Sequence, residues 1–473
     1  MRSRLRIPLA ALAAALAGCV PPAPYSLDAA ETPALVAVDW REVHQTIVGF
    51  GGTMGWIHPH PERRREVFDL LFKQLGASVL RIRALGGEAG DEDSIEPEND
   101  DADPNSFNWS RFKVATSEAK NAVIIKAALE RGVKTVIPTA WSPPGWMKTT
   151  GRRAGGGELE EKHLAEYAEA WAAYVIGMKR HFGIDTKYLS IQNEPDLRYY
   201  YPTCAMEPGP YAKAAAAVAA RLAKEKLPVT LAGPDTCRIY HLPEYLRAMA
   251  RAKVPPGTSP APVLTHLYDL GIGYGKPEAD PKRWRAAREL ARRHKRPLWL
   301  TEAANYLSHG VEKGSYAEAI IWAQKIHHAL VSGDCEVVCY WSLYFDKRGE
   351  ALVYAAESEA RRFEITPKFW TSMNYYRFVR PGMLRCSARS SGRRLLVSAF
   401  RDPDSRRRVI VIVNTSDRPA RVRLPFAARE TWLAYVTSAA EKCHQSVACS
   451  RTMTLDPRSV TTLVHERPAA AGR

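Results

Sequence analysis

From about residue 45 onward, short apolar segments alternate with longer stretches of helical periodicity, and this alternation constrains the fold most. Eight segments are predicted strands: Ile47–Phe50, Val79–Arg83, Thr135–Pro138, Tyr188–Ile191, Val229–Ala232, Val263–His266, Leu298–Thr301 and Val337–Tyr340. Helical patterns lie between most of them, for example over residues 160–181 and 211–225. Such alternation indicates parallel strands joined by crossover helices. Eight units fit a closed (β/α)8 TIM barrel better than an open sheet, and we expect this barrel over residues 45–375.

The sequence changes character after about residue 376, where short strands separated by turn residues replace the alternation. The predicted strands are residues 395–400, 408–414, 420–424 and 460–464. This pattern is typical of a β-sandwich. The early apolar segment at residues 34–38 could add a strand to it. We therefore expect an α/β protein with an attached β-sandwich side domain, built from residues 31–44 and 376–468.

The N-terminus has the features of an export signal. A basic start is followed by an apolar run from Ile7 to Ala17, which is too short to span a bilayer. The run ends in Leu16-Ala17-Gly18-Cys19, which resembles a bacterial lipobox. We expect residues 1–19 to be a lipoprotein signal peptide, Cys19 to be lipidated and residues 20–30 to form a Pro-rich tether. The residue after Cys19 is Val20 and not aspartate, and by resemblance to Gram-negative lipoproteins this favours the outer membrane over the inner. The alternative is an ordinary signal peptide and a secreted protein.

The net charge of +16 comes mostly from arginines spread along the chain. A strongly basic chain can bind nucleic acid, anionic membranes or acidic polymers. No stripe of basic residues alternates with aromatics, as a nucleic-acid surface requires, so we predict no nucleic-acid partner. A solvated arginine-rich surface explains the charge, and an acidic polysaccharide partner is the alternative.

Two carboxylates follow predicted strands of the barrel. The fourth strand ends in Gln192-Asn193-Glu194-Pro195, and the seventh ends in Thr301-Glu302. Because active sites of TIM barrels lie at the C-terminal ends of the strands, Glu194 and Glu302 should converge on one rim. Cleavage of a glycosidic bond needs such a pair, one to protonate the leaving oxygen and one to attack or to activate water. Asn193 is placed to hydrogen-bond a sugar 2-hydroxyl.

Several further motifs along the barrel resemble those of glycoside hydrolase family 30, which includes bacterial glucuronoxylanases and glucosylceramidase. The matching segments, in chain order, are Gly49-Phe50-Gly51-Gly52, Trp141-Ser142-Pro143-Pro144-Gly145-Trp146-Met147-Lys148, Gly155-Gly156-Gly157-Glu158-Leu159, Ile191-Gln192-Asn193-Glu194-Pro195, His266-Leu267-Tyr268, Leu298-Trp299-Leu300-Thr301-Glu302 and Trp341. The resemblance implies a barrel with a β-sandwich built from both chain ends. It also implies a retaining β-glycosidase that works through a covalent glycosyl-enzyme intermediate.

By this resemblance Glu194 is the general acid/base and Glu302 the nucleophile. Glu194 must then hold a proton while Glu302 stays ionised. A nearby arginine favours the ionised form, and Arg81 is the predicted partner, with Arg83 as the second choice.

The remaining predicted substrate-binding residues follow strands on the same rim. Trp141 and Trp341 would wall the sugar subsite, although buried tryptophans can also be core residues. His266 would be a polar contact, and Tyr268 could hydrogen-bond Glu302. We expect no cofactor and no metal among these residues.

The sequence leaves the substrate open. We predict a β-linked polysaccharide or glycoside, with a xylanase or glucuronoxylanase favoured by the Trp-Ser-Pro-Pro-Gly-Trp-Met-Lys and Gly-Gly-Gly-Glu-Leu segments. A β-1,6-glucanase or galactanase and a glucosylceramidase-like exo-hydrolase are alternatives. Outside this class, the chain could be a non-catalytic glycan-binding lipoprotein, or a basic protein that binds anionic cell-surface polymer electrostatically. We expect a monomer that meets the membrane only through its lipid anchor.

Two other features have open interpretations. Acidic residues cluster between residues 88 and 103, after the second predicted strand. They could bind calcium, or they could form a solvated loop stabilised by nearby arginines. Cys204 and Cys237 each follow a predicted strand and could pair in a disulfide.

Overall fold

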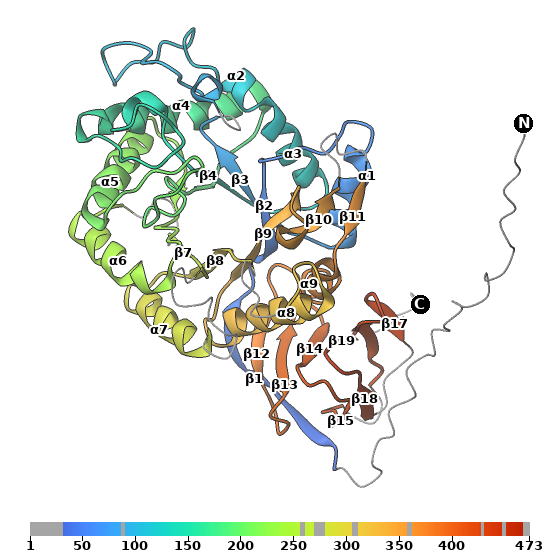
Figure 1. Ribbon diagram of the computed structural model, residues 1–473. Coiled ribbons are helices and arrows are strands. Elements are labelled where there is room, and N and C mark those ends of the chain that lie inside the picture. The colour runs from blue at the N-terminus through green and yellow to red at the C-terminus, as the bar shows by residue number, and fades with distance from the viewer. Residues whose placement is uncertain are drawn as a thin grey trace, which may run out of the picture. The chain divides into compact units, whose positions relative to one another are not determined.

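The computed structural model describes residues 32–86, 90–255, 261–268, 280–304, 311–356, 362–426, 430–446 and 451–466. The fold reported below is that of the compact unit Pro33–Arg473 (Figure 1). The predicted signal peptide, Cys19 and the tether lie outside the described residues, as do two residues of the acidic loop. No helix among the described residues is long and apolar enough to cross a membrane.

Eight strands form the barrel, each at a predicted position. They are β2 (Gly49–Met54), β3 (Val79–Ala84), β4 (Thr135–Ala140), β5 (Tyr188–Leu189), β6 (Thr230–Leu231), β7 (Val263–His266), β8 (Leu298–Glu302) and β9 (Val337–Phe345). Parallel pairing joins β2–β3, β3–β4, β5–β6, β7–β8 and β8–β9, and β9 returns to pair with β2. Single bridges, Thr139 with Ser190 and Thr236 with Thr265, link the remaining neighbours. The ring of strands is therefore closed.

The helices lie around these strands (Figure 1). They are α1 (Arg64–Phe68), α2 (Val114–Ser117), α3 (Ala119–Glu130), α4 (Leu164–Phe182), α5 (Pro208–Lys224), α6 (Leu242–Arg251), α7 (Asp280–Arg293) and α8 (Tyr316–Val331), with α9 (Pro367–Tyr376) after the barrel. Their ends follow local sequence rules. Proline occupies the first turn of α5, where no backbone donor is needed, and Gly183 ends α4 in a left-handed conformation with φ 69°.

The side domain is built from both ends of the described chain. Its strands are β1 (Ala34–Thr46), β12 (Leu384–Ser390), β13 (Leu395–Arg401), β14 (Arg408–Asn414), β15 (Ala420–Arg423), β16 (Leu433–Thr437), β17 (His444–Ser446), β18 (Thr452–Leu455) and β19 (Ser459–His465). The long strand β1 pairs with β12 on one side and with β15 on the other, and so connects two sheets. Alternate residues such as Val36, Val397 and Ile412 point into a shared apolar core. The predicted barrel with a β-sandwich side domain is confirmed.

Helices α8 and α9 join the barrel to the side domain. The Tyr316 hydroxyl donates hydrogen bonds to the carbonyls of Thr437 (3.0 Å) and Arg458 (2.7 Å). The Asn374 amide donates to Tyr435 O (3.1 Å) and Thr462 Oγ1 (3.0 Å). These bonds satisfy polar groups at the junction, where an unpaired group would cost free energy.

Candidate active site

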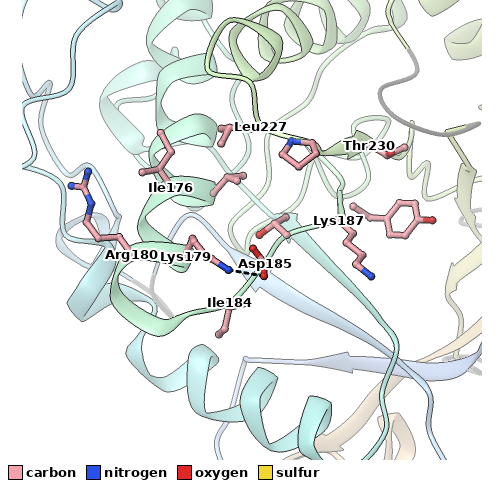
Figure 2. A pocket seen from close by; sticks show the side chains of 12 residues that line it. Ile176, Lys179, Arg180, Ile184, Asp185, Lys187, Leu227 and Thr230 are labelled. Carbon is pink, nitrogen blue, oxygen red and sulfur yellow. Dashed lines mark hydrogen bonds and ion pairs between the residues drawn. The ribbon is translucent and has the colours of Figure 1, made fainter.

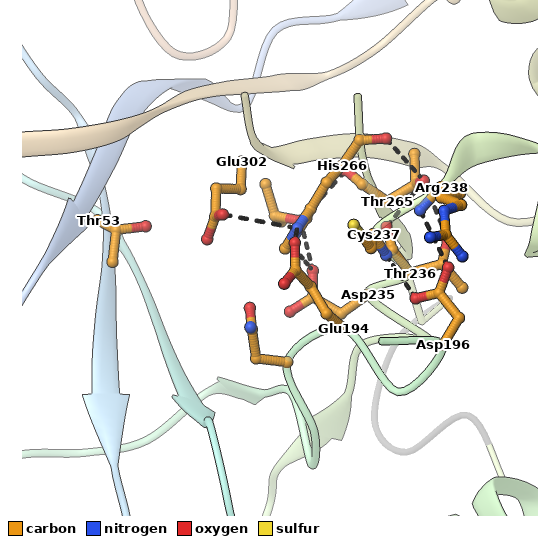
Figure 3. A network of polar contacts seen from close by, with 12 residues as sticks. Thr53, Glu194, Asp196, Asp235, Thr236, Cys237, Arg238, Thr265, His266 and Glu302 are labelled. Carbon is orange, nitrogen blue, oxygen red and sulfur yellow. Dashed lines mark hydrogen bonds and ion pairs between the residues drawn. The ribbon is translucent and has the colours of Figure 1, made fainter. Parts of the chain in front are cut away.

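Glu194 and Glu302 converge at the C-terminal rim of the barrel. Glu194 lies five residues beyond the last residue of β5, and Glu302 is the last residue of β8. Both side chains point toward His266 (Figure 3). One carboxylate oxygen of each glutamate and a ring nitrogen of His266 all lie within 4.8 Å of one another, and the three residues are buried. The two carboxylates therefore share one small, desolvated space.

Glu194 is held in an unusual backbone conformation. Its φ of 47° lies in the left-handed region, which residues with a side chain rarely occupy and which is associated with functional sites. The Glu194 amide donates to the carbonyl of Asp235 (3.0 Å), so the loop after β5 is tied to the loop after β6. The Tyr201 hydroxyl donates to Glu194 Oε2 (2.9 Å). Backbone and side chain are thus both fixed before any substrate binds.

Arg81, on β3, contacts the predicted nucleophile. Its guanidinium donates to Glu302 Oε2 (2.5 Å) and to Asn193 Oδ1 (2.5 Å), and its side chain is fully buried. Its Cζ atom lies 4.6 Å from the centre of the Trp141 ring, within cation–π range. Arg83, the second choice, lies instead over the ring of Trp56 at 5.0 Å. The structure thus brings Arg81, Asn193 and Glu302 together.

Asp235 is a central residue of the site that the sequence analysis missed. This fully buried carboxylate accepts hydrogen bonds from Arg81 (2.9 Å), Ser190 (2.9 Å), Thr301 (2.5 Å) and His266 (3.2 Å). It lies four residues beyond β6, the fifth barrel strand, and has a φ of 63°. The rule that led to Glu194, a carboxylate shortly after a barrel strand, also applies to Asp235.

His266, at the end of β7, bridges three carboxylates. Its Nδ1 lies 3.0 Å from Glu194 Oε1 and 3.7 Å from Glu302 Oε1, and its Nε2 lies 3.2 Å from Asp235 Oδ1. Tyr268 packs edge-on against the His266 ring with the ring centres 5.9 Å apart. The tyrosine that hydrogen-bonds a catalytic carboxylate in the described contacts is Tyr201, which binds Glu194. The expected hydrogen bond between Tyr268 and Glu302 stays a prediction.

The tryptophans form an aromatic group beside these charges. Trp141 lies T-shaped against Trp56 (5.5 Å) and tilted against Trp341 (6.2 Å). Trp341 is 8% exposed and its indole donates to Glu350 (3.1 Å), whereas Trp141 is 2% exposed. Trp141 therefore packs against the Arg81 guanidinium, and little of its ring surface is exposed for contact with a sugar.

Charge and burial fix the protonation of the site. Burial raises the pKa of the Glu302 carboxyl to about 7, and the neighbouring Glu194 carboxylate adds to the rise, while His266 and Arg81 oppose it. Arg81 lies beside Glu302 as expected and favours its ionised form, but burial outweighs this effect on the pKa of the Glu302 carboxyl. Two carboxyl groups this close cannot both ionise freely, so the pair retains one proton near neutral pH.

The other two ionisable groups are charged. Burial lowers the pKa of His266, but Glu302 and Asp235 outweigh it and raise the value to about 10. The pKa of Asp235 is lowered, because Arg81 and His266 overcome the effect of burial. In the protonated form, which this shift favours, both ring nitrogens of His266 are donors, and they face the surrounding carboxylates.

A second polar network anchors the neighbouring loop (Figure 3). Asp196 accepts hydrogen bonds from the amides of Cys237 (2.7 Å) and Arg238 (3.1 Å) and contacts His241 Nδ1 (2.9 Å). Cys237 is buried with a free thiol, and so is Cys204, so the suggested disulfide between them was wrong. Asp196 therefore links the loop after β5 to the loop after β6 through hydrogen bonds.

A surface pocket elsewhere on the barrel does not belong to this site. It lies between the end of α4 and the starts of β5 and β6, and its lining includes Ile184, Lys187 and Thr230 (Figure 2). An ion pair between Lys179 and Asp185 (2.7 Å) crosses its edge. Because the pocket is at the N-terminal end of the strands, it faces away from the catalytic rim.

A closed (β/α)8 barrel with two adjacent carboxylates after its fourth and seventh strands defines a retaining glycoside hydrolase. Comparison with known proteins agrees. The model of the glycosyl hydrolase family 30 TIM-barrel domain matches residues 92–201. In this part of the barrel, which includes Asn193 and Glu194, the chain is similar to glycoside hydrolase family 30.

Two curated relatives and one solved structure illustrate the similarity. Glucuronoxylanase XynC of Bacillus subtilis (strain 168) is 25% identical over 395 residues, which are 81% of this chain and 78% of that protein. Putative glucosylceramidase 4 of Caenorhabditis elegans is 37% identical over 95 residues, 19% of this chain and 18% of that protein. The catalytic domain of GH30 xylanase C from Talaromyces cellulolyticus superposes with a TM-score of 0.73 at 20% identity, and covers 92% of this chain and 100% of that domain.

Proposed function

We propose that this retaining glycoside hydrolase cleaves the β-1,4-linked backbone of xylan. The observation that supports this substrate is the similarity to a glucuronoxylanase along 81% of the chain, whereas the glucosylceramidase similarity covers 19%. A match that spans barrel and side domain includes the loops that shape the substrate cleft, and these loops determine specificity.

Glu302 is the proposed nucleophile and Glu194 the proposed general acid/base. Arg81 donates to Glu302 at 2.5 Å, and such a charge-assisted bond favours the ionised form. The general acid must carry a proton before it acts, and this role is proposed for Glu194. With Arg81 and His266 positive, and with Asp235 and Glu302 negative, a neutral Glu194 makes the site electrically balanced.

The chemistry follows from this distribution. Glu302 attacks the anomeric carbon while Glu194 gives its proton to the leaving oxygen, and a glycosyl-enzyme forms. Glu194, now ionised, then removes a proton from water, which hydrolyses the intermediate. The distance within 4.8 Å between carboxylate oxygens supports this double displacement, because inverting enzymes place their carboxyl groups about 6.5–9.5 Å apart.

Substrate contacts follow from the same geometry. Arg81 occupies Oδ1 of Asn193, and we expect the amide nitrogen of Asn193 to donate to the sugar 2-hydroxyl. Trp341, at the partly exposed end of the aromatic group, is the proposed stacking surface for a pyranose ring. His266 contacts the carboxylates of Glu194 and Asp235, and Tyr268 packs against the His266 ring, so we expect both residues to position the carboxylates.

A glucuronic acid branch is not required in this proposal. Arg348, the basic residue after β9, already contacts Glu364 (3.4 Å) and the Gly314 carbonyl (3.3 Å). An arginine engaged in this way is a poor clamp for a uronate. We therefore expect linear xylan to be cleaved as readily as glucuronoxylan.

A substrate panel tests the proposal. Purified enzyme is incubated with linear xylan, glucuronoxylan, β-1,6-glucan, β-1,6-galactan, glucosylceramide and aryl β-glycosides, and the products are identified by mass spectrometry. Xylo-oligosaccharides from both xylans are expected, with none from Glu302→Gln. Hydrolysis of another glycan alone would refute the xylan assignment but keep the mechanism. Binding without turnover of any substrate would favour a glycan-binding protein.

We also propose that the enzyme is a monomeric outer-membrane lipoprotein anchored through Cys19. The lipobox-like Leu16-Ala17-Gly18-Cys19 sequence supports this location. Metabolic labelling with a fatty acid should mark the wild-type protein but not Cys19→Ala, and the wild type should fractionate with outer membranes. A labelled Cys19→Ala protein, or unlabelled wild type in the medium, would contradict the anchor.

A further inference from the structure

A second cluster of buried carboxylates lies away from the catalytic rim. Glu96 and Asp100 belong to the acidic segment between β3 and α2, and Glu166 lies in the first turn of α4. One carboxylate oxygen from each lies within 4.8 Å of the other two. Their exposed fractions are 0%, 3% and 8%. We call these three residues the acidic cluster.

Glu96 points into this cluster without a partner. Neither of its carboxylate oxygens accepts a hydrogen bond of ordinary geometry from any described residue, although the backbone amide of Asp100 approaches closely enough to lower the pKa of Glu96. Oε2 of Glu166 is also buried and unpartnered within the described chain. Buried polar groups in folded proteins nearly always have a partner, so two such carboxylates together indicate a ligand.

The surrounding protein does not neutralise the acidic cluster. Arg221 contacts Glu169 (3.3 Å), which follows Glu166 on α4, and Glu225 (2.9 Å), and no described lysine or arginine forms an ion pair with the three cluster residues. Glu96 is fully buried, and it lies close to the carboxylates of Asp100 and Glu166. Such a cluster must hold either protons or a cation.

We propose that the acidic cluster is a structural Ca²⁺ site that fastens the acidic segment to α4. Three converging carboxylates supply hard oxygen ligands, which Ca²⁺ and Mg²⁺ prefer, and no histidine or cysteine of the described chain joins the group. Ca²⁺ is favoured because it tolerates irregular geometry and accepts further ligands from carbonyls or water, whereas Mg²⁺ demands a near-ideal octahedron. The cation would offset the negative charge that Arg221 leaves uncompensated.

A cation bound at the acidic cluster would also stabilise the segment after β4, which contributes Trp141 to the active site. The Trp146 indole donates to the Glu96 carbonyl (3.1 Å), and its ring packs against His163 at 4.9 Å. Trp146 lies in the segment after β4 that begins with Trp141. A cation at Glu96 therefore holds together the acidic segment, the start of α4 and the segment that carries Trp141. Its effect on catalysis is indirect, through stability.

Terbium luminescence and thermal unfolding test the site independently of hydrolysis. Tb³⁺ replaces Ca²⁺ at oxygen sites, and Trp146 lies close enough to excite it. Chelator-treated enzyme should give tryptophan-sensitised Tb³⁺ emission that Ca²⁺ displaces, and excess Ca²⁺ should raise its Tm by about 5 °C. Mg²⁺ at the same concentration should do less. Absence of both responses in the wild type would overturn the proposal and mean that protons occupy the cluster.

Matched variants assign the response to these residues. Glu96→Gln and Glu166→Gln should each lose the emission and the Ca²⁺-dependent rise in Tm. Glu98→Gln is the control, because Glu98 lies in the same segment but is 82% exposed and pairs with Arg111. If Glu96→Gln does not fold, the Tb³⁺ emission and the Ca²⁺-dependent rise in Tm are compared between Glu166→Gln, on α4, and the wild type. An unchanged response in a folded cluster variant, or its loss in Glu98→Gln, would refute the site.

Discussion

Two buried groups of carboxylates in this barrel differ in how their charge is balanced. At the catalytic rim, Glu194, Asp235 and Glu302 surround two cations, Arg81 and His266, so that one retained proton makes the group neutral. In the acidic cluster no cation of the described chain contacts the three carboxylates. Burial of carboxylates alone therefore does not define an active site. The catalytic rim can release and regain one proton, whereas the acidic cluster lacks the fixed positive charge for this task.

The largest expected effect comes from removing either glutamate of the rim. Glu302→Gln should lower kcat by about 10⁴-fold or more on every substrate, since no nucleophile remains. Glu194→Gln should lower it by about 10²–10⁴-fold on xylan but far less on aryl glycosides whose leaving group needs no proton. Steady-state kinetics on both substrate types measures the contrast.

Azide sharpens this assignment. It should restore turnover of the aryl glycoside in Glu194→Ala with a β-glycosyl azide as product, and in Glu302→Ala with the α-anomer. The reverse pattern would exchange the two roles. Equal loss on both substrates in Glu194→Gln would refute Glu194 as the acid.

Breaking the charge balance at the rim should cost stability. Asp235→Asn leaves Arg81 and His266 without their shared carboxylate, and removal of one partner from a buried ion pair typically costs about 3–5 kcal/mol. Urea unfolding of the variant and the wild type measures the change. Asp185→Asn, which breaks the exposed pair with Lys179, is the control and should cost at most about 1 kcal/mol. Equal effects of the two changes would contradict the central position of Asp235.

The pH profile reports the shared proton. Because the pKa of Glu302 is raised to about 7 beside Glu194, the pair keeps its proton below that pH and loses it above. Wild-type kcat/KM on xylan should therefore fall as pH rises through about 7. Glu194→Gln, assayed on an activated aryl glycoside, should lose this fall, since glutamine cannot titrate. A decline above pH 7 that persists in the variant would assign the proton to another group.

The smallest expected effect belongs to the exposed part of the acidic segment. Glu98→Gln removes one surface pair with Arg111, which should change the free energy of unfolding by less than about 0.5 kcal/mol. Chemical denaturation measures it. A loss of several kcal/mol would mean that the whole segment, and not its buried residues, holds the local structure.

The sequence was sufficient for the features that depend on order along the chain. Eight apolar segments with helices between them predicted the barrel, and the positions of Glu194 and Glu302 after strands predicted one shared rim. The contacts across the barrel were harder to foresee. Asp235 follows a barrel strand as Glu194 does, but its role arises only when Arg81, Thr301 and His266 surround it. The raised pKa of Glu302 likewise depends on burial, which the local sequence does not reveal.

The acidic segment is a second feature that the sequence alone could not resolve. Its composition is compatible with both a solvated loop and a cation site. Only the fold shows that Glu98 faces solvent while Glu96, two residues earlier, is fully buried against α4. Alternation of exposure along an irregular segment follows no fixed period, so the sequence could not separate these two residues.

Covalent trapping tests the central claim most directly. An activated 2-deoxy-2-fluoro-β-xyloside forms a slowly hydrolysed glycosyl-enzyme in a retaining enzyme, and peptide mass spectrometry locates the sugar. We expect one fluoroxylosyl group per molecule, attached to Glu302, and none in Glu302→Gln. A label on Glu194 or on any other residue, or xylan hydrolysis with inversion and no label, would contradict it.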